Sequence, residues 1–281
     1  MNLRQRFMHT HPPPIIHSTD NPVYKKLLAL QTARGIHKHG EYLVAGPKLT
    51  AEAVRQQSQT IGAWISTPDL PPPPPALDGT QWVLLDKRLF RNVNVFGAPG
   101  ILLTMRLPDL PVFQPKAPWP AGCTLFIPFG DPENVGGAIR AAAGLGAARV
   151  VLLREAACPF LPKAIRASAG AAWKIRLESG PGLAELTSAT EAPLFALDME
   201  GEPLEHVKPP ACYGLVVGME GLGLPEALRR HCRRVSIPMT NGIESLNAAA
   251  ATAVALWAWR EKTLITPPRS LRTPVIPADA G

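Results

Sequence analysis

Three segments in the second half of the chain carry residues whose types and spacing suit ligand chemistry. The first, residues 129–140, runs from a predicted strand into a predicted helix. Asp131 and Asn134 are residue types that cap helices, and Gly136 with its neighbouring glycine permits close backbone approach. Arg140 lies about two turns into the helix and is the only charge between Val135 and Ala148. This segment predicts a helix N-terminus beside a ligand, with one guanidinium nearby.

The second segment, residues 215–225, is a buried strand followed by a loop that contains three glycines, Gly218, Gly221 and Gly223. Ligands of open α/β sheets bind at the carboxyl ends of strands, where such a loop lies. The dinucleotide pattern G-x-G-x-x-G fails because Glu226 occupies the third glycine position. No P-loop pattern occurs in the chain either. A nicotinamide dehydrogenase is therefore disfavoured.

The third segment, residues 235–247, is a short strand and an irregular loop that precede a helix reaching about residue 260. Ser245 is the predicted N-cap of this helix. Residues 248–257 carry no charge, so the helix either lies in the core with every side buried or turns one side to a partner subunit. We favour the partner, because small side chains permit close helix packing and the helix follows a ligand loop.

The elements around these segments predict an α/β fold. Short apolar strands at 124–127, 150–153, 194–197 and 215–217 alternate with helices, which is typical of a parallel sheet covered on both faces. In the first half we expect a helix that begins at Asn21 and ends at Gly35, and a second helix at 49–56. Strands are expected at 41–45, 82–85 and 101–105, and the proline run 71–75 predicts a stiff, exposed, extended loop.

Proline placement predicts where the chain divides. Five prolines between residues 107 and 120 indicate a linker. We therefore expect a flexible tail at 1–20, a small α/β domain at 21–106, the linker at 107–120, a second domain at 121–262 and a flexible tail at 263–281.

Composition bounds the class of protein. The net charge is +7, and the excess lies mostly in residues 1–113, where 12 lysines and arginines face 7 acidic residues. This favours a polyanionic partner but does not identify one. No apolar run is long enough to span a membrane and no signal peptide is recognisable. The four cysteines form no C-x-x-C pair, so neither a disulfide framework nor a metal site is expected, and we expect a cytoplasmic location.

Taken together, the three segments resemble the signature motifs of the SpoU/TrmH family of RNA 2′-O-ribose methyltransferases, in the SPOUT superfamily. The resemblance covers most of residues 123–260, and a stretch at 160–170 also resembles the family. Residues 21–56 resemble, more weakly, the ribosomal-protein-like RNA-binding domain of many members. The matching motif residues are Asn134, Gly136 and Arg140, then Gly218, Glu220, Gly221 and Gly223, then Ile237, Pro238, Met239, Ser245, Leu246 and Asn247.

This resemblance implies a fold, a cofactor and an assembly. The C-terminal domain would be a SPOUT domain, a parallel sheet with a deep trefoil knot, which would be an exception to the rule that chains do not thread loops. It would bind S-adenosylmethionine in the knot and act as a homodimer whose active sites draw on both subunits. The implied cofactor-binding residues are Gly218, Gly223, Ile237, Met239, Ser245, Leu246 and Asn247, and the implied catalytic residues are Arg140, Asn134 and Glu220.

Three positions depart from the family pattern. Ala141 stands where members usually have Thr or Ser, and Ala249 stands where many have Ser, so a hydroxyl that some members use is missing. Asn241 replaces a frequent Gly, and Asn tolerates left-handed backbone better than most residues. These changes bear on details of catalysis and leave the class intact.

Methyl transfer from a sulfonium is an in-line displacement, so alignment supplies much of the rate. The ribose 2′-hydroxyl must lose its proton or have its developing charge stabilised, and Arg140 is our candidate to orient it or to hold the adjacent phosphate. A basic group on the N-terminal domain is the candidate RNA surface, with ordinary solvated surface as the alternative. Its members are Lys25, Lys26, Arg34, His37, Lys38, His39 and Lys48.

We expect structured RNA as substrate, with ribosomal RNA favoured over transfer RNA because the accessory domain resembles that of ribosomal-RNA members. Two other functions stay open. One is a non-catalytic RNA-binding protein on the same fold, and the other is a small-molecule methyltransferase, which the basic additional domain disfavours.

Overall fold

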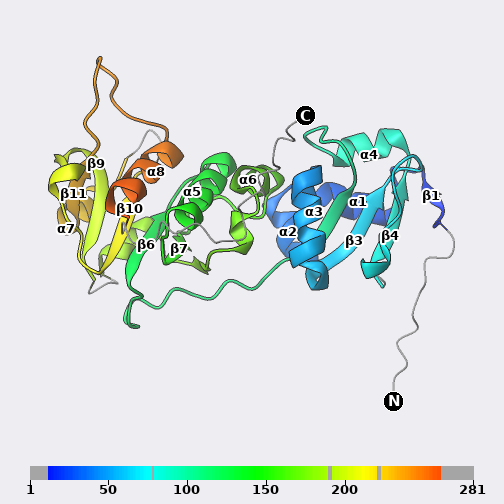
Figure 1. Cartoon of the computed structure of the whole chain (residues 1–281), viewed down its shortest axis with the longest axis horizontal. Helices are drawn as coiled ribbons and strands as arrows, with labels where there is room; N and C mark the ends of the chain where they lie inside the picture. Colours follow the sequence, from blue (N-terminus) through cyan, green and yellow to red (C-terminus); the bar gives the residue numbers. More distant parts are fainter. Residues whose placement is uncertain (1–11, 78, 189–191, 220–222, 261–281) are drawn as a thin grey trace, which may run out of the picture.

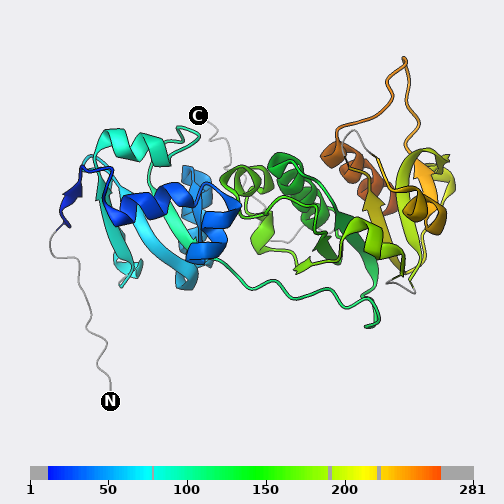
Figure 2. The same cartoon turned by 180° about the vertical axis from the view of Figure 1, so that it is seen from behind.

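The computed structural model describes residues 12–77, 79–188, 192–219 and 223–260. The chain forms two β-sheets that lie side by side along the long axis of the molecule, each with its own helices (Figure 1). Figure 2 shows the same arrangement from behind. Among the described residues, no helix combines the length and the apolar character that crossing a membrane requires.

The N-terminal sheet is mixed and has the strand order β1-β4-β3-β5-β2. Strands β1, β4 and β3 run parallel, and β5 pairs antiparallel with β3 and β2. Helices α1 and α4 pack on one face, and α2 and α3 on the other. The elements are β1 (Ile15–Ile16), α1 (Pro22–Ala29), α2 (Ala33–His39), β2 (Glu41–Ala45), α3 (Pro47–Gln56), η1 (Ser58–Thr60), β3 (Ile61–Ser66), η2 (Pro75–Leu77), β4 (Gln81–Leu85), α4 (Lys87–Val93) and β5 (Leu102–Arg106).

Two expectations for the start of the chain were wrong. The predicted helix from Asn21 to Gly35 is two helices, because Thr32 starts a new one by accepting a hydrogen bond from the Gly35 amide at 3.1 Å. Gly35 lies within α2, where a Cβ would lie 1.9 Å from the Ala29 carbonyl oxygen. The predicted tail 1–20 is ordered where Ile15–Ile16 pair with the edge of β4. Residues 1–11 and the predicted tail at 263–281 lie outside the described residues.

The C-terminal sheet is entirely parallel, as predicted, with the order β11-β9-β10-β6-β7-β8. Helices α5, α6 and α8 cover one face, and α7 with apolar residues of the connecting segment covers the other. The elements are β6 (Gly122–Ile127), α5 (Pro132–Gly144), β7 (Arg149–Leu152), α6 (Pro162–Ser168), η3 (Ala171–Trp173), β8 (Leu177–Ser179), η4 (Leu183–Ser188), β9 (Leu194–Pro203), η5 (Leu204–His206), β10 (Cys212–Val217), α7 (Glu226–His231), β11 (Arg233–Ser236) and α8 (Ala248–Trp259).

The proline-rich segment between the two sheets is fastened to the second one. Val112 forms a parallel bridge with Ser179, and the Phe113 amide donates to the Ser179 carbonyl at 2.8 Å. The Phe113 and Trp119 rings pack edge to face, with centroids 5.7 Å apart. The buried Arg149 guanidinium lies 5.0 Å from the Phe113 ring centroid. The segment therefore continues the edge of the sheet beside β8.

The two halves also contact each other directly. The Trp173 indole donates to the Tyr42 hydroxyl at 2.9 Å, and Lys174 forms an ion pair with the buried Glu52. The Arg166 guanidinium lies 4.8 Å from the centroid of the Phe96 ring. Aromatic, ionic and hydrogen-bonding contacts thus join η3 and α6 to the N-terminal sheet and its loops.

Candidate active site

The three segments identified in the sequence meet at one cavity of about 520 Å³. The cavity lies at the carboxyl ends of β10 and β11 and beside the middle of β9, between the N-termini of α5 and α8, as expected for a ligand site in a parallel sheet. Its lining residues are Asp131, Asn134, Leu197, Asp198, Met199, Val217, Gly218, Met219, Ile237, Met239, Glu244, Ser245, Leu246, Asn247, Ala248 and Ala251.

The first segment supplies the N-terminus of α5. Asp131 caps this helix by accepting a hydrogen bond from the Glu133 amide at 3.0 Å. Asn134 is one turn further along, buried, and lines the cavity. The predicted close backbone approach is confirmed at both glycines. A Cβ on Gly136 would lie 2.3 Å from the Ala164 carbonyl oxygen of α6, and a Cβ on Gly137 would lie 2.9 Å from the Ala249 Cβ of α8.

The second segment supplies the loop after β10. Gly218 and Met219 line the cavity. Met219 and Gly223 exchange two backbone hydrogen bonds, of 3.1 and 3.0 Å, which close the loop on itself. Gly223 has a φ of 64°, so it shapes this turn, and it is not among the described lining residues. Glu220, a predicted catalytic residue, lies outside the described residues.

The third segment supplies the opposite wall, to which Ile237, Met239, Ser245, Leu246 and Asn247 all contribute. This loop projects from the body of the molecule between β11 and α8 (Figure 1). Within it Asn241 adopts a left-handed backbone with a φ of 57°, as its residue type allows.

The predicted N-cap of α8 was wrong. Asn247, two residues beyond Ser245, is the cap, and its Oδ1 accepts from the amides of Ala249 and Ala250 at 3.0 and 3.2 Å. Its Nδ2 also donates to Asn134 Oδ1 at 2.8 Å. The Asn247 carboxamide thus uses both of its polar atoms: Oδ1 accepts from two backbone amides of α8 while Nδ2 donates to α5. This bond ties the start of α5 to the start of α8.

Arg140 does not line the cavity, although it shares α5 with Asn134. Successive residues of an α-helix are about 100° apart around its axis. Gly136 faces α6 and Gly137 faces α8, so Arg140, four residues after Gly136, points between them and away from the sheet. Its side chain is exposed, and no hydrogen bond or ion pair to it is present among the described residues.

The uncharged helix α8 has one uncovered side. Thr252, Ala255 and Leu256 are buried against the rest of the domain, whereas Val254 is 39% exposed and Trp257 is 56% exposed. The projecting loop before the helix adds exposed apolar residues at Ile243 and Leu246. The sequence alternative in which every side of this helix is buried within the chain is therefore wrong.

Sequence reasoning missed one wall of the cavity. Leu197, Asp198 and Met199 line it from an irregular stretch of β9, and Asp131 and Glu244 also contribute. The available signal was a carboxylate and a glycine directly after an apolar strand, at the edge of the sheet where ligands bind.

The charge of the cavity contrasts with that of the chain. Although the net charge is +7, the charged side chains among the described lining residues are the carboxylates of Asp131, Asp198 and Glu244. No lysine or arginine is among the lining residues of the described ranges. A pocket of this kind suits a ligand with positive charge and without phosphate groups.

The predicted RNA-binding residues of the N-terminal domain differ in their surroundings. Lys26 forms a part-buried ion pair with Glu41 at 2.7 Å, and Lys25 pairs with the exposed Asp20 at 2.8 Å. Arg34, Lys38 and Lys48 are exposed, and the first two lie one turn apart on α2. These last three side chains are the ones available to an external anion.

Comparison with known proteins agrees with the geometry. The profile of the SpoU rRNA Methylase family matches residues 125–257, which include the described residues that line the cavity. Residues 125–257 belong to the SpoU family. The SpoU segment contains the second half of β6, the strands β7 to β11 and nearly all of α8, so the family match covers most of the parallel sheet.

Curated relatives of this chain include the "Ribosomal RNA small subunit methyltransferase G 2" of Syntrophobacter fumaroxidans. It is 41% identical over 245 residues, which are 87% of this chain and 48% of the relative. The "23S rRNA (guanosine-2′-O-)-methyltransferase RlmB" of Xanthomonas campestris is 34% identical over 142 residues, which are 45% of this chain and 53% of the relative. The chain thus spans about half the length of these two relatives.

Solved structures support the fold of the whole described chain. An rRNA methyltransferase from Sinorhizobium meliloti, described as AdoMet-bound, has a TM-score of 0.72 at 20% identity and covers 87% of this chain and 96% of its own. The SpoU methyltransferase AviRb from Streptomyces viridochromogenes has a TM-score of 0.71 at 22% identity, over 85% of this chain and 96% of its own. Both similarities extend over the N-terminal sheet as well as the SpoU domain.

Proposed function

We propose that this chain transfers a methyl group from S-adenosylmethionine to a ribose 2′-hydroxyl of structured RNA, with ribosomal RNA as the substrate class. The observation that carries the proposal is the single cavity built from three segments that are far apart in the sequence, with only carboxylates among its charged described lining residues. Two relatives named as rRNA methyltransferases support it, as do an AdoMet-bound rRNA methyltransferase and the AdoMet complex of the SpoU methyltransferase AviRb among the similar structures.

The residues present fit this cofactor. S-adenosylmethionine carries a sulfonium, an ammonium and a carboxylate group, so its net charge is positive, and it has no phosphate that would need a cationic cradle. The cavity volume of about 520 Å³ lies within the range of small-molecule sites. A dinucleotide would bring a pyrophosphate beside Asp131 and Asp198, which argues against a dehydrogenase.

In this proposal the cofactor is held by the loop after β10 and the loop before α8. Gly218 offers backbone without a side chain, and Ile237, Met239 and Leu246 supply apolar contact, while Ser245 and Asn247 supply polar groups. Gly223 acts through the turn it closes with Met219. When bound, the cofactor presents an electrophilic methyl group.

The chain's own catalytic work falls to Arg140 and to the Asn134–Asn247 pair. Arg140 remains charged at any physiological pH, so it acts by orienting the 2′-hydroxyl or its neighbouring phosphate rather than by taking the proton. Asn134, fixed by Asn247 at 2.8 Å, holds the start of α5 against the cavity. We keep Glu220 as a further candidate on its motif position alone.

We also propose the homodimer and the deep trefoil knot that the family resemblance implies. The exposed apolar side of α8 and its projecting loop support a dimer, because a second copy would cover Val254 and Trp257. Arg140 points away from its own cavity beside α8, which supports its action in a site shared between subunits. The 237–247 loop and the loop after β10 line the same cavity, which is compatible with a knot.

The N-terminal domain is the proposed RNA-binding unit. Arg34, Lys38 and Lys48 offer exposed positive charge for phosphates, and contacts of this kind weaken as salt concentration rises.

The deciding experiment combines binding and turnover. Calorimetry with S-adenosylhomocysteine tests the cavity, and mapping of 2′-O-methyl positions in RNA from cells with and without the gene tests the reaction and finds the nucleotide. Arg140→Ala should abolish turnover with cofactor affinity nearly unchanged, and Arg154→Ala, which alters an exposed arginine paired with Glu185, should leave both intact. Absence of cofactor binding in the wild type would indicate the non-catalytic RNA-binding protein instead.

A further inference from the structure

One wall of the cavity is made by an interruption of the sheet. Strand β11 pairs with β9 up to Arg234, opposite Ala196, and resumes with Val235 opposite Glu202. Residues 197–201 therefore have no partner in β11, although Leu197 still pairs with Val217 of β10, and the first three of them line the cavity. Bulges that leave the pairing at the edge of a sheet commonly redirect side chains toward a functional site. We call residues 197–201 the β9 bulge.

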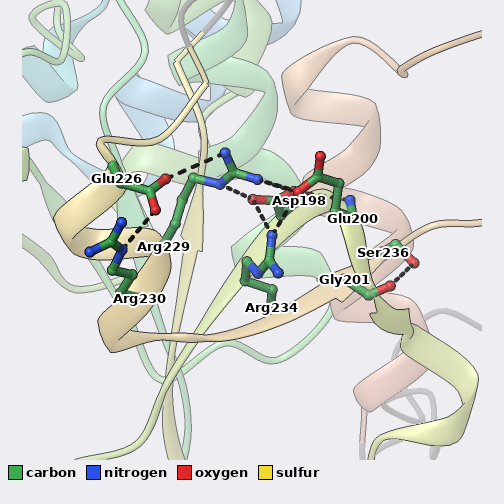
Figure 3. A network of polar contacts seen from close by, with 8 residues as sticks. All are labelled: Asp198, Glu200, Gly201, Glu226, Arg229, Arg230, Arg234 and Ser236. Atoms are coloured by element: carbon green, nitrogen blue, oxygen red, sulfur yellow. Dashed lines mark hydrogen bonds and ion pairs between the residues drawn. The ribbon is translucent and has the colours of Figure 1, made fainter.

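The β9 bulge is held in one shape. A Cβ on Gly201 would lie 2.5 Å from the Val235 backbone, so only glycine allows the two chains to approach this closely. Ser236 Oγ donates to the Gly201 carbonyl at 2.9 Å (Figure 3). These contacts at Gly201 fix the end of the bulge and so restrict the position of Asp198, three residues earlier in the chain.

Arg229 of α7 holds Asp198 from the other side. Its Nε donates to Asp198 Oδ2 at 2.7 Å and its Nη2 lies 3.4 Å from Oδ1 (Figure 3). Arg229 is itself held by Glu200 at 2.8 Å, and Arg234 also pairs with Glu200, at 3.0 Å. Helix α7 directly follows the loop after β10, so this network links two walls of the cavity.

The chemistry of Asp198 follows from these contacts. Its side chain is only 10% exposed, and its negative charge is compensated by the Arg229 guanidinium and by Arg234, whose Nη1 lies 4.0 Å from Asp198 Oδ2. Two carboxylate oxygens offer about four acceptor positions. The described donors are Arg229 Nε, Arg229 Nη2 and the Glu200 amide at 3.0 Å, which leaves acceptor capacity at the cavity. A charge-compensated acceptor of this kind suits a neutral hydroxyl donor better than a cation.

We propose that Asp198 contacts the cofactor by accepting a hydrogen bond from a ribose hydroxyl of its nucleoside, and that Arg229 is the positioning residue that presents Asp198. This inference rests on the proposed function, because it takes an adenosine-containing cofactor as the ligand. It adds a recognition group that lies outside the three motif segments, on an element that connects two of them.

The test is calorimetric binding of S-adenosylhomocysteine and of its 2′-deoxy and 3′-deoxy ribose analogues to the full chain. A hydrogen bond to a charged group makes a difference of about ten-fold or more in affinity. The wild type should therefore bind at least one deoxy analogue about ten-fold more weakly than the parent. Asp198→Ala should bind the parent about ten-fold more weakly and should bind the parent and the analogues equally. If the alanine variant does not fold, the isosteric Asp198→Asn serves instead: it keeps an acceptor oxygen but loses the charge, so it should discriminate between parent and deoxy analogue less than the wild type does.

Arg229 is tested against its neighbour on α7. Arg229→Gln should weaken parent binding and reduce discrimination between parent and deoxy analogue, and Arg229→Lys should restore much of both. Arg230→Gln is the matched control, because Arg230 is 79% exposed and pairs with Glu226 rather than with Asp198. In turnover assays Arg229→Gln should raise the KM for the cofactor and leave kcat at saturation nearly unchanged.

The outcomes separate the two proposals. Failure of the wild type to bind S-adenosylhomocysteine refutes the proposed function. Binding without any loss for the deoxy analogues, or equal discrimination in Asp198→Ala, refutes the role of Asp198 and leaves the proposed function standing. Equal weakening by Arg229→Gln and Arg230→Gln assigns α7 a general structural role and removes Arg229 as a positioning residue.

Discussion

The contact between α5 and α6 at Gly136 gives the sharpest prediction about how the site is built. An alanine there would place Cβ 2.3 Å from the Ala164 carbonyl oxygen, 2.7 Å from the Ala167 Cβ and 3.0 Å from the Ser168 amide nitrogen. Ordinary van der Waals contact begins near 3.4 Å, so the backbone of α6 has to retreat by about 1 Å. Because the first and third of these atoms belong to the backbone, no side-chain rotation relieves the overlap.

The change in the free energy of unfolding caused by Gly136→Ala is the balance of two opposing effects. Overpacking a closely packed site costs about 1–3 kcal/mol, and this case lies at the upper end because whole helices must move. Replacing a helical glycine by alanine recovers up to about 1 kcal/mol. We expect Gly136→Ala to lower the free energy of unfolding by about 2 kcal/mol. S-adenosylhomocysteine should also bind more weakly, because Asn134 lies two residues before Gly136 on the cavity wall.

Gly144→Ala is the matched control in the same helix, since a Cβ there meets no heavy atom within 4 Å. Urea denaturation followed by circular dichroism measures both variants, with the slope of the transition checked for constancy. Gly144→Ala should be as stable as the wild type or more stable by a few tenths of a kcal/mol. The reasoning fails if Gly136→Ala keeps the wild-type midpoint, or if both variants lose the same stability.

Four further outcomes are expected. Asn247→Ala removes the N-cap of α8 and should lower the free energy of unfolding by about 1–2 kcal/mol, measured by thermal denaturation. An unchanged Tm would contradict the capping role of Asn247. Trp257→Asp should convert a dimer to a monomer in light scattering, whereas an unchanged mass would argue against the α8 interface. Burial raises the pKa of Cys123 and Cys232 from 9.0 to about 12, so the unfolded chain ionises first. Stability should therefore fall as pH rises above about 9, and urea midpoints at pH 8 and 10.5 that coincide would contradict this. Lys48→Ala should weaken RNA binding and reduce the salt slope by about 1, and an unchanged slope would exclude a phosphate contact.

The parallel sheet and the ligand loops were predictable because their signals are local. Apolar strands such as β10 are buried on both faces and therefore lack alternation, which separates them from surface strands. Gly136 and Gly218 stood out because glycine in an ordered segment implies close approach. The structure places both beside another backbone, α6 in one case and the Gly223 turn in the other.

The errors share a different cause, which is competition between equally good local choices. Ser245 and Asn247 are both capping residues, and only the partner Asn134, 113 residues away, decides between them. Thr32 could lie within a helix or start a new one, and the choice depends on the packing of Gly35 against Ala29. Long-range contacts of this kind have no signature within the segment itself.

The β9 bulge was beyond sequence reasoning for a third reason. A strand prediction fixes neither register nor the point where pairing lapses, and here pairing lapses where Arg229 pulls Asp198 aside. The placement of Arg140 outside the cavity likewise depends on the angle at which α6 and α8 cross α5.

Residues 111–113 are fastened along β8, and the Trp173–Tyr42 hydrogen bond joins the two halves of the chain. These contacts bear on how the chain would recognise a large substrate. A tethered module would let the two halves search for separate features of a nucleic acid, with affinity set by tether length. Here these contacts fix the distance between the basic surface of the N-terminal domain and the cavity. Under the proposed function, only an RNA whose tertiary shape spans the distance between the basic surface and the cavity can contact both, so folding of the RNA would itself become a criterion of selection.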